Sequence, residues 1–261
     1  MSAEKIIGVL YSSGGTADVG RHAVRALLDV HPGKVRVLTR DPKTLLEEQH
    51  WKSVCGPYTF TPQELKEKLE VRAVDFATVD SSTLAGHLTG VSAVVSALGN
   101  RQPFYGDRVA ARGTKTLMEA IGKSGNKVDR VVAVTSSGCN EDWPPMEFHW
   151  AGTIFKWMLR LLVRDGYYDL CQAENAITGS GFDNLDYLLV RPVGLGEERR
   201  EKGEWFIQKK KYQDKLGPDI SKMDCARFVV KEALEPTYHK TAVVIGSNPD
   251  TFVLDEPPLE E

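Results

Sequence analysis

Short apolar runs alternate along the chain with segments in which apolar residues recur every three or four positions. The short runs, rich in β-branched residues, are typical of buried strands and cover residues 5–11, 34–39, 71–77, 92–99, 130–137, 186–192 and 241–246. The segments with helical spacing cover residues 21–30, 113–125, 152–165, 169–179 and 221–235. This alternation predicts a doubly wound α/β fold, with a mostly parallel sheet covered by helices on both faces.

Two segments, 40–70 and 138–165, contain more residues than a simple connection needs. In the second, apolar side chains share one helical face and cations another: Ile154, Trp157, Met158, Leu161 and Leu162 against Lys156, Arg160 and Arg164. We interpret this helix either as a surface for a membrane or a partner, or as a core-facing helix or lid with a solvated basic edge. With no linker or repeat, residues 1–261 are expected to form one domain with a frayed, acidic tail at 250–261.

Composition narrows the class of protein. The 261 residues are 41% hydrophobic, enough for a sizeable core, and 26% charged. A net charge of −3 and a pI of about 6.1 argue against nucleic acid as a main partner. The four cysteines are far apart and the six histidines show no ligand spacing, so neither a disulfide framework nor a metal site is expected. No apolar run reaches the length of a membrane span and no targeting pattern is present, which predicts a soluble cytoplasmic protein.

The turn after the first predicted strand has the composition of a phosphate-binding loop. It reads Gly14-Gly15-Thr16-Ala17-Asp18-Val19-Gly20 and opens a predicted helix. Dinucleotide-binding turns use glycines for the tight turn, for the approach of backbone to pyrophosphate and for helix–strand packing. Gly14 fits the first role and Gly20 the third, whereas Ala17 stands at the middle position and requires a small phosphate shift or a bridging water. We predict nucleotide binding here; the alternative is an ordinary strand-to-helix turn.

The end of the second predicted strand bears on the choice of cofactor. Arg40 stands about where an acidic residue would hold the ribose hydroxyls of NAD. A guanidinium can bind a 2′-phosphate in a forked geometry and stack on adenine, which favours NADP. Asp41 follows directly, so the alternative is that Arg40 pairs with Asp41 or with solvent.

Further polar and small residues follow the other predicted strands. In an open α/β sheet, ligands bind outside the carboxyl ends of the strands. Hydroxyls and glycines at several of these ends are not required by a core, and together they indicate a single site. The predicted cofactor-binding residues at these ends are Asp75, Ala97, Leu98, Gly99, Arg101, Thr135, Pro192 and Val193.

Taken together, the chain resembles the atypical short-chain dehydrogenase/reductases, and within them the NmrA-like and biliverdin-reductase-B (flavin-reductase)-like NAD(P)H-binding proteins. The matching segments span nearly the whole chain: "GGTADVG", "VLTRDP", "LAGHLTGVSAVVSALG", "GTKTLMEAIGKSG", "RVVAVTSSG", "AENAITGSGFDNLDYLLVRP" and "ISKMDCARFVV". The resemblance implies one Rossmann domain, with a small substrate-binding region that we place at 138–165 and 194–212. It also implies phosphates on 14–20, adenosine near Arg40, residues 97–99 along the cofactor, and Pro192 and Val193 at the nicotinamide.

In the wider superfamily, a serine after the fifth strand works with a Tyr-x-x-x-Lys, whose lysine brings the tyrosine anion within reach near neutral pH. By this resemblance, Ser136 or Ser137 matches the serine and Tyr168 matches the tyrosine. Gln172 stands where the lysine would be; it can hydrogen-bond a ribose but carries no charge. Tyr168 is therefore expected to donate a proton but to be a poor base. The alternative for Tyr168 and its neighbour Tyr167 is a half-buried position in the wall of the core.

The missing lysine shapes the functional prediction. Hydride delivery from NADPH to an electron-poor ring needs little acid–base help, whereas oxidation of an alcohol needs a base. We therefore predict an NADPH-dependent reductase that acts on a small conjugated or carbonyl substrate. Two alternatives stay open: an NADP-binding redox sensor or regulator without turnover, and a redox-neutral isomerase, cyclase or dehydratase of a specialised metabolite.

Overall fold

The computed structural model describes residues 5–12, 15–46, 62–99, 108–123, 127–139, 164–196, 203–208, 216–217 and 219–248. The side chains at 15–17, 44 and 62 are outside that description. Most of the predicted helix at 152–165, much of the segment 194–212 and the predicted frayed tail at 250–261 also lie outside the described residues.

The centre of the molecule is an eight-stranded sheet, which confirms the predicted fold class. Its order is β3-β2-β1-β4-β5-β6-β10-β8, and every neighbouring pair is parallel except β10 with β8. The strands are β1 (Ile6–Tyr11), β2 (Val35–Thr39), β3 (Leu69–Ala73), β4 (Val91–Ala97), β5 (Arg130–Val134), β6 (Asp186–Pro192), β8 (Phe206–Ile207) and β10 (Thr241–Gly246). A second, two-stranded parallel sheet pairs β7 (Leu195–Gly196) with β9 (Ile220–Ser221).

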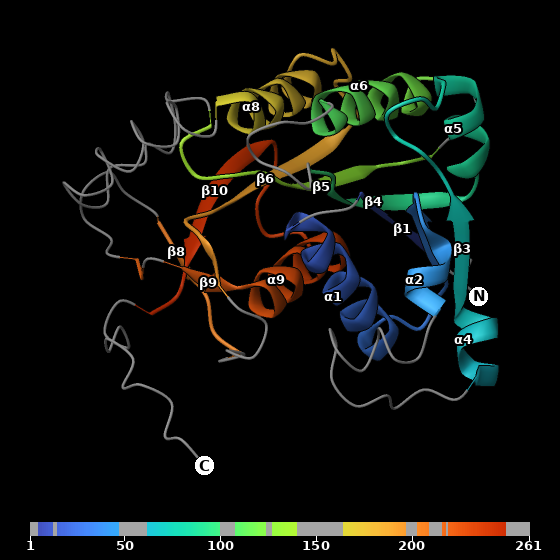
Figure 1. Cartoon of the computed structure of the whole chain (residues 1–261), viewed down its shortest axis with the longest axis horizontal. Coiled ribbons are helices and arrows are strands. Elements are labelled where there is room, and N and C mark those ends of the chain that lie inside the picture. Colours follow the sequence, from blue (N-terminus) through green and yellow to red (C-terminus); the bar gives the residue numbers. More distant parts are fainter. Residues whose placement is uncertain are drawn as a thin grey trace.

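Helices cover both faces of the large sheet (Figure 1). One face carries α1 (Gly15–Val30) and α9 (Lys222–Leu234), with α2 (Pro42–Leu46) and α4 (Pro62–Lys68) near the β3 edge. The other carries α5 (Ser81–His87), α6 (Val109–Ile121) and α8 (Arg164–Thr178). In the part of the chain that the structure describes, no helix is long and apolar enough to cross a membrane.

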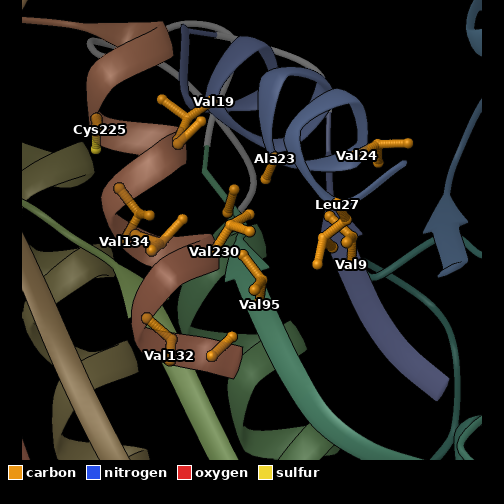
Figure 2. Packing of buried hydrophobic residues seen from close by; sticks show 14 of the residues in the cluster. Val9, Val19, Ala23, Val24, Leu27, Val95, Val132, Val134, Cys225 and Val230 are labelled. Atoms are coloured by element: carbon orange, nitrogen blue, oxygen red, sulfur yellow. The ribbon is translucent and has the colours of Figure 1, made fainter. Parts of the chain in front are cut away.

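The two faces have separate cores because successive side chains of a strand point to opposite sides. Val9 of β1 belongs to the core beneath α1 and α9, whereas the next residue, Leu10, belongs to the core beneath α5, α6 and α8. Figure 2 shows the first core from close by, where Val19 and Leu27 of α1 and Val230 of α9 meet valines of the central strands. This packing fixes the start of α1 and the start of α9 at the same edge of the sheet.

Element boundaries differ from the sequence prediction where tertiary contacts decide them. β3 ends at Ala73 rather than continuing through residue 77. The Val74 amide makes the last hydrogen bond to β2, and from Asp75 onward the chain forms a turn, in which Asp75 accepts hydrogen bonds from the amides that follow it. α6 begins four residues before the predicted start at 113, since Asp169 of α8 accepts hydrogen bonds from the Ala110 and Ala111 amides at 3.0 and 2.8 Å. A carboxylate on one helix therefore caps the neighbouring helix, a contact that no local sequence signal reveals.

Candidate cofactor-binding and active site

Ser12 joins the carboxyl ends of β1 and β4. Its hydroxyl donates a hydrogen bond to the Gly99 carbonyl oxygen and accepts one from the Gly99 amide at 3.1 Å. The strand order reverses between β1 and β4, and this is the place where open α/β sheets bind ligands. Sequence reasoning missed Ser12, although a hydroxyl directly after a buried strand was an available signal.

Gly20 allows α1 to pack closely on β1. A side-chain carbon added at Gly20 would lie 2.6 Å from Cβ of Tyr11, a contact that real side chains do not tolerate. The preceding residue, Val19, is buried in the core that also contains Cys225 of α9 (Figure 2). The structure thus gives Gly20 a helix–strand packing role, which is the role of the third glycine in a dinucleotide-binding turn.

Other predicted residues of the turn are only partly described. Gly15 is the first residue of α1, and the side chains of Thr16 and Ala17 lie outside the description. Gly14 and Arg101 also lie outside the described residues. Their assignment to the cofactor stays a prediction.

Asp18, in the first turn of α1, forms ion pairs with two cationic side chains. Its Oδ1 lies 2.8 Å from Nη1 of Arg21, and its Oδ2 lies 3.0 Å from Nζ of Lys222, the first residue of α9. Lys222 is 204 residues away along the chain, so sequence reasoning had no signal that would place it beside the predicted phosphate turn.

His22 is buried next to this cluster, with 2% of its surface exposed. Burial lowers the pKa of His22 from 6.5 to about 4; the charge of Asp18 opposes this shift, and the charges of Lys222 and Arg21 reinforce it. The imidazole is therefore neutral at pH 7 and adds no charge to the site.

Polar residues extend into solvent after β2 and β3. Arg40 is exposed directly after β2, and the following residue, Asp41, accepts a hydrogen bond from the Lys43 amide at 3.1 Å at the start of α2. Asp75 is exposed after β3, where its carboxylate accepts the Ala77 amide at 3.0 Å. Since β2 and β3 are parallel neighbours, Arg40 and Asp75 lie at the same edge of the sheet.

The end of β4 contributes backbone rather than side chains. Ala97 and Leu98 are buried. Leu98 packs so closely on α6 that a side-chain carbon added at Gly113 would lie 2.9 Å from its Cδ1. The part of residues 97–99 that can face a ligand is therefore the peptide backbone that Ser12 fixes at Gly99.

A buried ion pair connects β6 to α8. Nε and Nη2 of Arg191 donate to the two carboxylate oxygens of Glu174 at 2.9 and 2.8 Å, and both side chains are buried. The hydroxyl of Thr135, just after β5, donates to the same carboxylate at 2.7 Å. Thr135 was predicted to bind the cofactor, but the structure places its hydroxyl in this internal network.

The two candidate serines differ in accessibility. The amide of Ser137 donates to the Pro192 carbonyl at 3.1 Å, and its hydroxyl donates to the Val193 carbonyl at 3.3 Å. Ser137 is fully buried, whereas Ser136 is half-buried. Val193 is buried as well. Ser136 is therefore the serine that a substrate can reach more readily, close to the predicted nicotinamide contacts Pro192 and Val193.

α8 directs Tyr167, rather than Tyr168, toward the end of β5. The Tyr167 hydroxyl donates to the Gly138 carbonyl oxygen at 2.6 Å. Tyr168 is 46% exposed, and its ring centre lies 5.8 Å from the guanidinium carbon of Arg164. Gln172, one turn further along, is exposed as well. The helix thus brings Tyr167 to the strand ends and places Tyr168 and Gln172 on its solvent side.

A cavity of about 670 Å³ lies between α6 and α8. Its wall includes Gln172 but no residue from the carboxyl ends of the strands: Arg108, Ala111, Arg112, Lys115, Met118, Glu119, Gln172, Asn175, Ala176, Gly179, Ser180 and Phe182. This cavity is separate from the candidate cofactor site, which we place by the strand ends and the α1 turn.

The family whose description is NAD(P)H-binding matches residues 14–236, a range that starts at the glycine turn and ends after α9. The chain belongs to this NAD(P)H-binding family. The match confirms the predicted relationship and includes each predicted site residue. No curated protein is similar enough to the chain to count as a match.

Solved structures share the fold of this NAD(P)H-binding chain. A wide-type short-chain dehydrogenase/reductase from Veillonella parvula, in complex with NADP, is 19% identical with a TM-score of 0.66, over 98% of this chain and 99% of that one. The anaerobillin reductase ChuY from Escherichia coli O157:H7 is 17% identical with a TM-score of 0.59, over 98% and 99%. A candidate NADH-flavin reductase from Streptococcus pneumoniae is 13% identical with a TM-score of 0.61, over 94% and 100%.

Proposed function

We propose that the chain is an NADPH-dependent reductase that transfers a hydride to a small conjugated or carbonyl substrate. The NAD(P)H-binding family supplies the cofactor class. The cofactor would lie across the reversal point between β1 and β4, with pyrophosphate at the start of α1 and nicotinamide near Pro192 and Val193. The substrate would bind above the nicotinamide, and the segments 138–165 and 194–212 stay its predicted binding region.

The observation that carries the reductive assignment is the helical register of α8. The tyrosine that reaches the strand ends is Tyr167, and the residue four positions later is Cys171, which is buried. The thiols of Cys171 and Cys139 interact, and this contact together with burial raises the pKa of Cys139 well above its usual range. A cysteine at this position supplies no positive charge to stabilise a phenolate.

Without that charge, the site is poorly suited to remove a proton from an alcohol. Hydride transfer to an electron-poor acceptor has no such requirement, because solvent or a neutral hydroxyl can supply the proton. Ser136, a half-buried hydroxyl at the end of β5, would orient a substrate oxygen. This chemistry matches the reductase names among the proteins of similar fold, which include reductases of a bilin-type substrate and of flavin.

NADP is proposed over NAD because Arg40 is exposed at the end of β2. A guanidinium there can bind a 2′-phosphate through two parallel hydrogen bonds. The Veillonella parvula protein of similar fold was solved with NADP, which supports the same choice.

The test is to titrate NADPH and NADH and then follow NADPH oxidation with a panel of quinones, flavins and enones. We expect NADPH to bind more tightly than NADH, and at least one acceptor class to be reduced. Tight binding without turnover across the panel would instead favour a redox sensor. Product formation without net change in the cofactor would favour a redox-neutral reaction.

A further inference from the structure

The Asp18 carboxylate holds two cations at the start of α1, one from its own helix and one from α9. Arg21 and Lys222 lie on different oxygens, at 2.8 and 3.0 Å. The three side chains are 20%, 17% and 20% exposed for Asp18, Arg21 and Lys222, so they are partly shielded but still open to solvent. The cluster carries a net charge of one positive unit.

The fold places this cluster beside the predicted pyrophosphate turn. Asp18 lies in the first turn of α1, within the predicted phosphate turn at 14–20, and Lys222 is the first residue of α9. The two helices pack together on one face of the sheet, where Val19 and Cys225 belong to a single core (Figure 2). Both helices therefore start at the edge of the sheet where the cofactor is proposed to bind, and both bring a cation to it.

A carboxylate at this position has two opposing effects on the binding of a dinucleotide. Its negative charge stabilises the start of α1, which carries partial positive charge, and it keeps both cations in place. The same charge repels an incoming pyrophosphate and uses hydrogen bonds that the cations could otherwise make to phosphate oxygens. Asp18 bonds to both cations at once, so a change at this one carboxylate alters the hydrogen bonding of both.

We propose that Lys222 and Arg21 are pyrophosphate ligands of the cofactor site and that Asp18 is their internal competitor. Cofactor phosphates would bind by taking over hydrogen bonds that Arg21 and Lys222 donate to Asp18. Asp18 thus lowers the affinity for the dinucleotide, and α9 contributes directly to a site that the turn alone would otherwise form. This inference rests on the proposed function, because it assumes that a dinucleotide binds at the turn.

If Lys222 binds phosphate and Asp18 competes with it, substitutions at the two positions should change the affinity for NADPH in opposite directions. Asp18→Asn removes the competitor and leaves both cations, so NADPH should bind about three- to tenfold more tightly. Lys222→Met removes one ligand and leaves the acid, so NADPH should bind about three- to tenfold more weakly, while Lys222→Arg should retain wild-type affinity. Both effects should shrink at high salt, and inorganic pyrophosphate should compete better with NADPH in Asp18→Asn.

The experiment is a binding titration with NADPH on the full chain, with thermal unfolding of each variant. Asp29→Asn is the matched control for Asp18→Asn, since Asp29 is also on α1 and pairs with Arg25 at 3.2 Å, but lies in the last turn. Lys115→Met is the control for Lys222→Met, because Lys115 is exposed on α6, on the other face of the sheet.

The outcomes separate the two proposals. If Asp18→Asn and Lys222→Met both weaken NADPH binding, or neither changes it, the cluster only builds the turn and this inference is wrong while the cofactor site stands. If the wild-type chain binds neither NADPH nor NADH, the proposed function fails and this inference fails with it. If Lys222→Met does not fold, Asp18→Asn still tests whether Asp18 competes with the cofactor: tighter NADPH binding supports the proposal, and unchanged or weaker binding contradicts it.

Discussion

The hydroxyl of Tyr167 donates to the carbonyl oxygen of Gly138 across 2.6 Å, so α8 turns this tyrosine toward the end of β5. Tyr168, one residue later, consequently points to solvent, with Gln172 exposed one turn beyond it. The tyrosine that best matches the superfamily spacing is thus not the tyrosine that faces the strand ends.

Replacement of the two tyrosines should give different results. Tyr168→Phe should change the rate of NADPH oxidation by less than about tenfold, since a general acid typically contributes 10²–10⁴-fold. Tyr167→Phe should lower the free energy of unfolding by about 1 kcal/mol through loss of its hydrogen bond. Steady-state kinetics and urea unfolding measure the two effects. A thousandfold loss in Tyr168→Phe would show that it is the proton donor after all.

Arg40→Ala should reduce the affinity for NADPH by roughly tenfold or more, because a charged hydrogen-bond donor to the 2′-phosphate is lost. NADH has no 2′-phosphate, so its affinity should change little. Parallel titrations of both cofactors against wild type and variant provide the measurement. An equal loss for both would show that Arg40 does not recognise that phosphate.

The buried pair of Arg191 and Glu174 should be sensitive to the loss of one partner. Glu174→Ala leaves the Arg191 guanidinium buried without its carboxylate and should lower the free energy of unfolding by about 3–5 kcal/mol. The double variant Glu174→Leu with Arg191→Met should be more stable than Glu174→Ala, because no charge is left buried. Urea unfolding of the variants tests this; a double variant as unstable as the single would mean that packing, rather than the unpaired charge, dominates.

Acid should destabilise the fold through His22. Its pKa is about 4 in the folded protein and 6.5 when exposed, so the unfolded chain binds an extra proton between these values. The neutral ring therefore contributes on the order of 3 kcal/mol to the free energy of unfolding. This contribution is complete above about pH 6.5 and is lost as the pH falls toward 4. Urea midpoints measured from pH 7 to pH 4 should fall less steeply in His22→Gln. The same slope in both proteins would contradict this assignment.

The sheet and its main helices were predictable because their apolar periodicity is strong. The β-branched runs of β1, β4, β5, β6 and β10 gave their positions to within a few residues. α5 was missed, since Leu84 is its one buried residue and Asp80 caps it through two backbone amides. β7 and β9 were missed because each has two residues, too few for any period to show.

In the candidate site, the residues that local sequence could identify are those whose role is set by the backbone. Gly20 is such a residue, since its packing on β1 depends only on the turn and the strand before it. Lys222 could not be predicted, because its position beside Asp18 depends on how α1 and α9 pack. The choice between Tyr167 and Tyr168 also needed the structure, since one residue changes the direction of a helical side chain by about 100°.

Glu174 connects three elements that the chain visits separately: its own helix, the end of β5 through Thr135, and β6 through Arg191. Local unfolding of any one of these elements would break the hydrogen bonds that Glu174 makes with the others. The three elements should therefore unfold as one cooperative unit. Amide hydrogen exchange should accordingly be slow and uniform across β5, β6 and α8, while β3, at the open edge of the sheet, exchanges first. The half of the sheet proposed to hold the nicotinamide is thereby the half that fluctuates least.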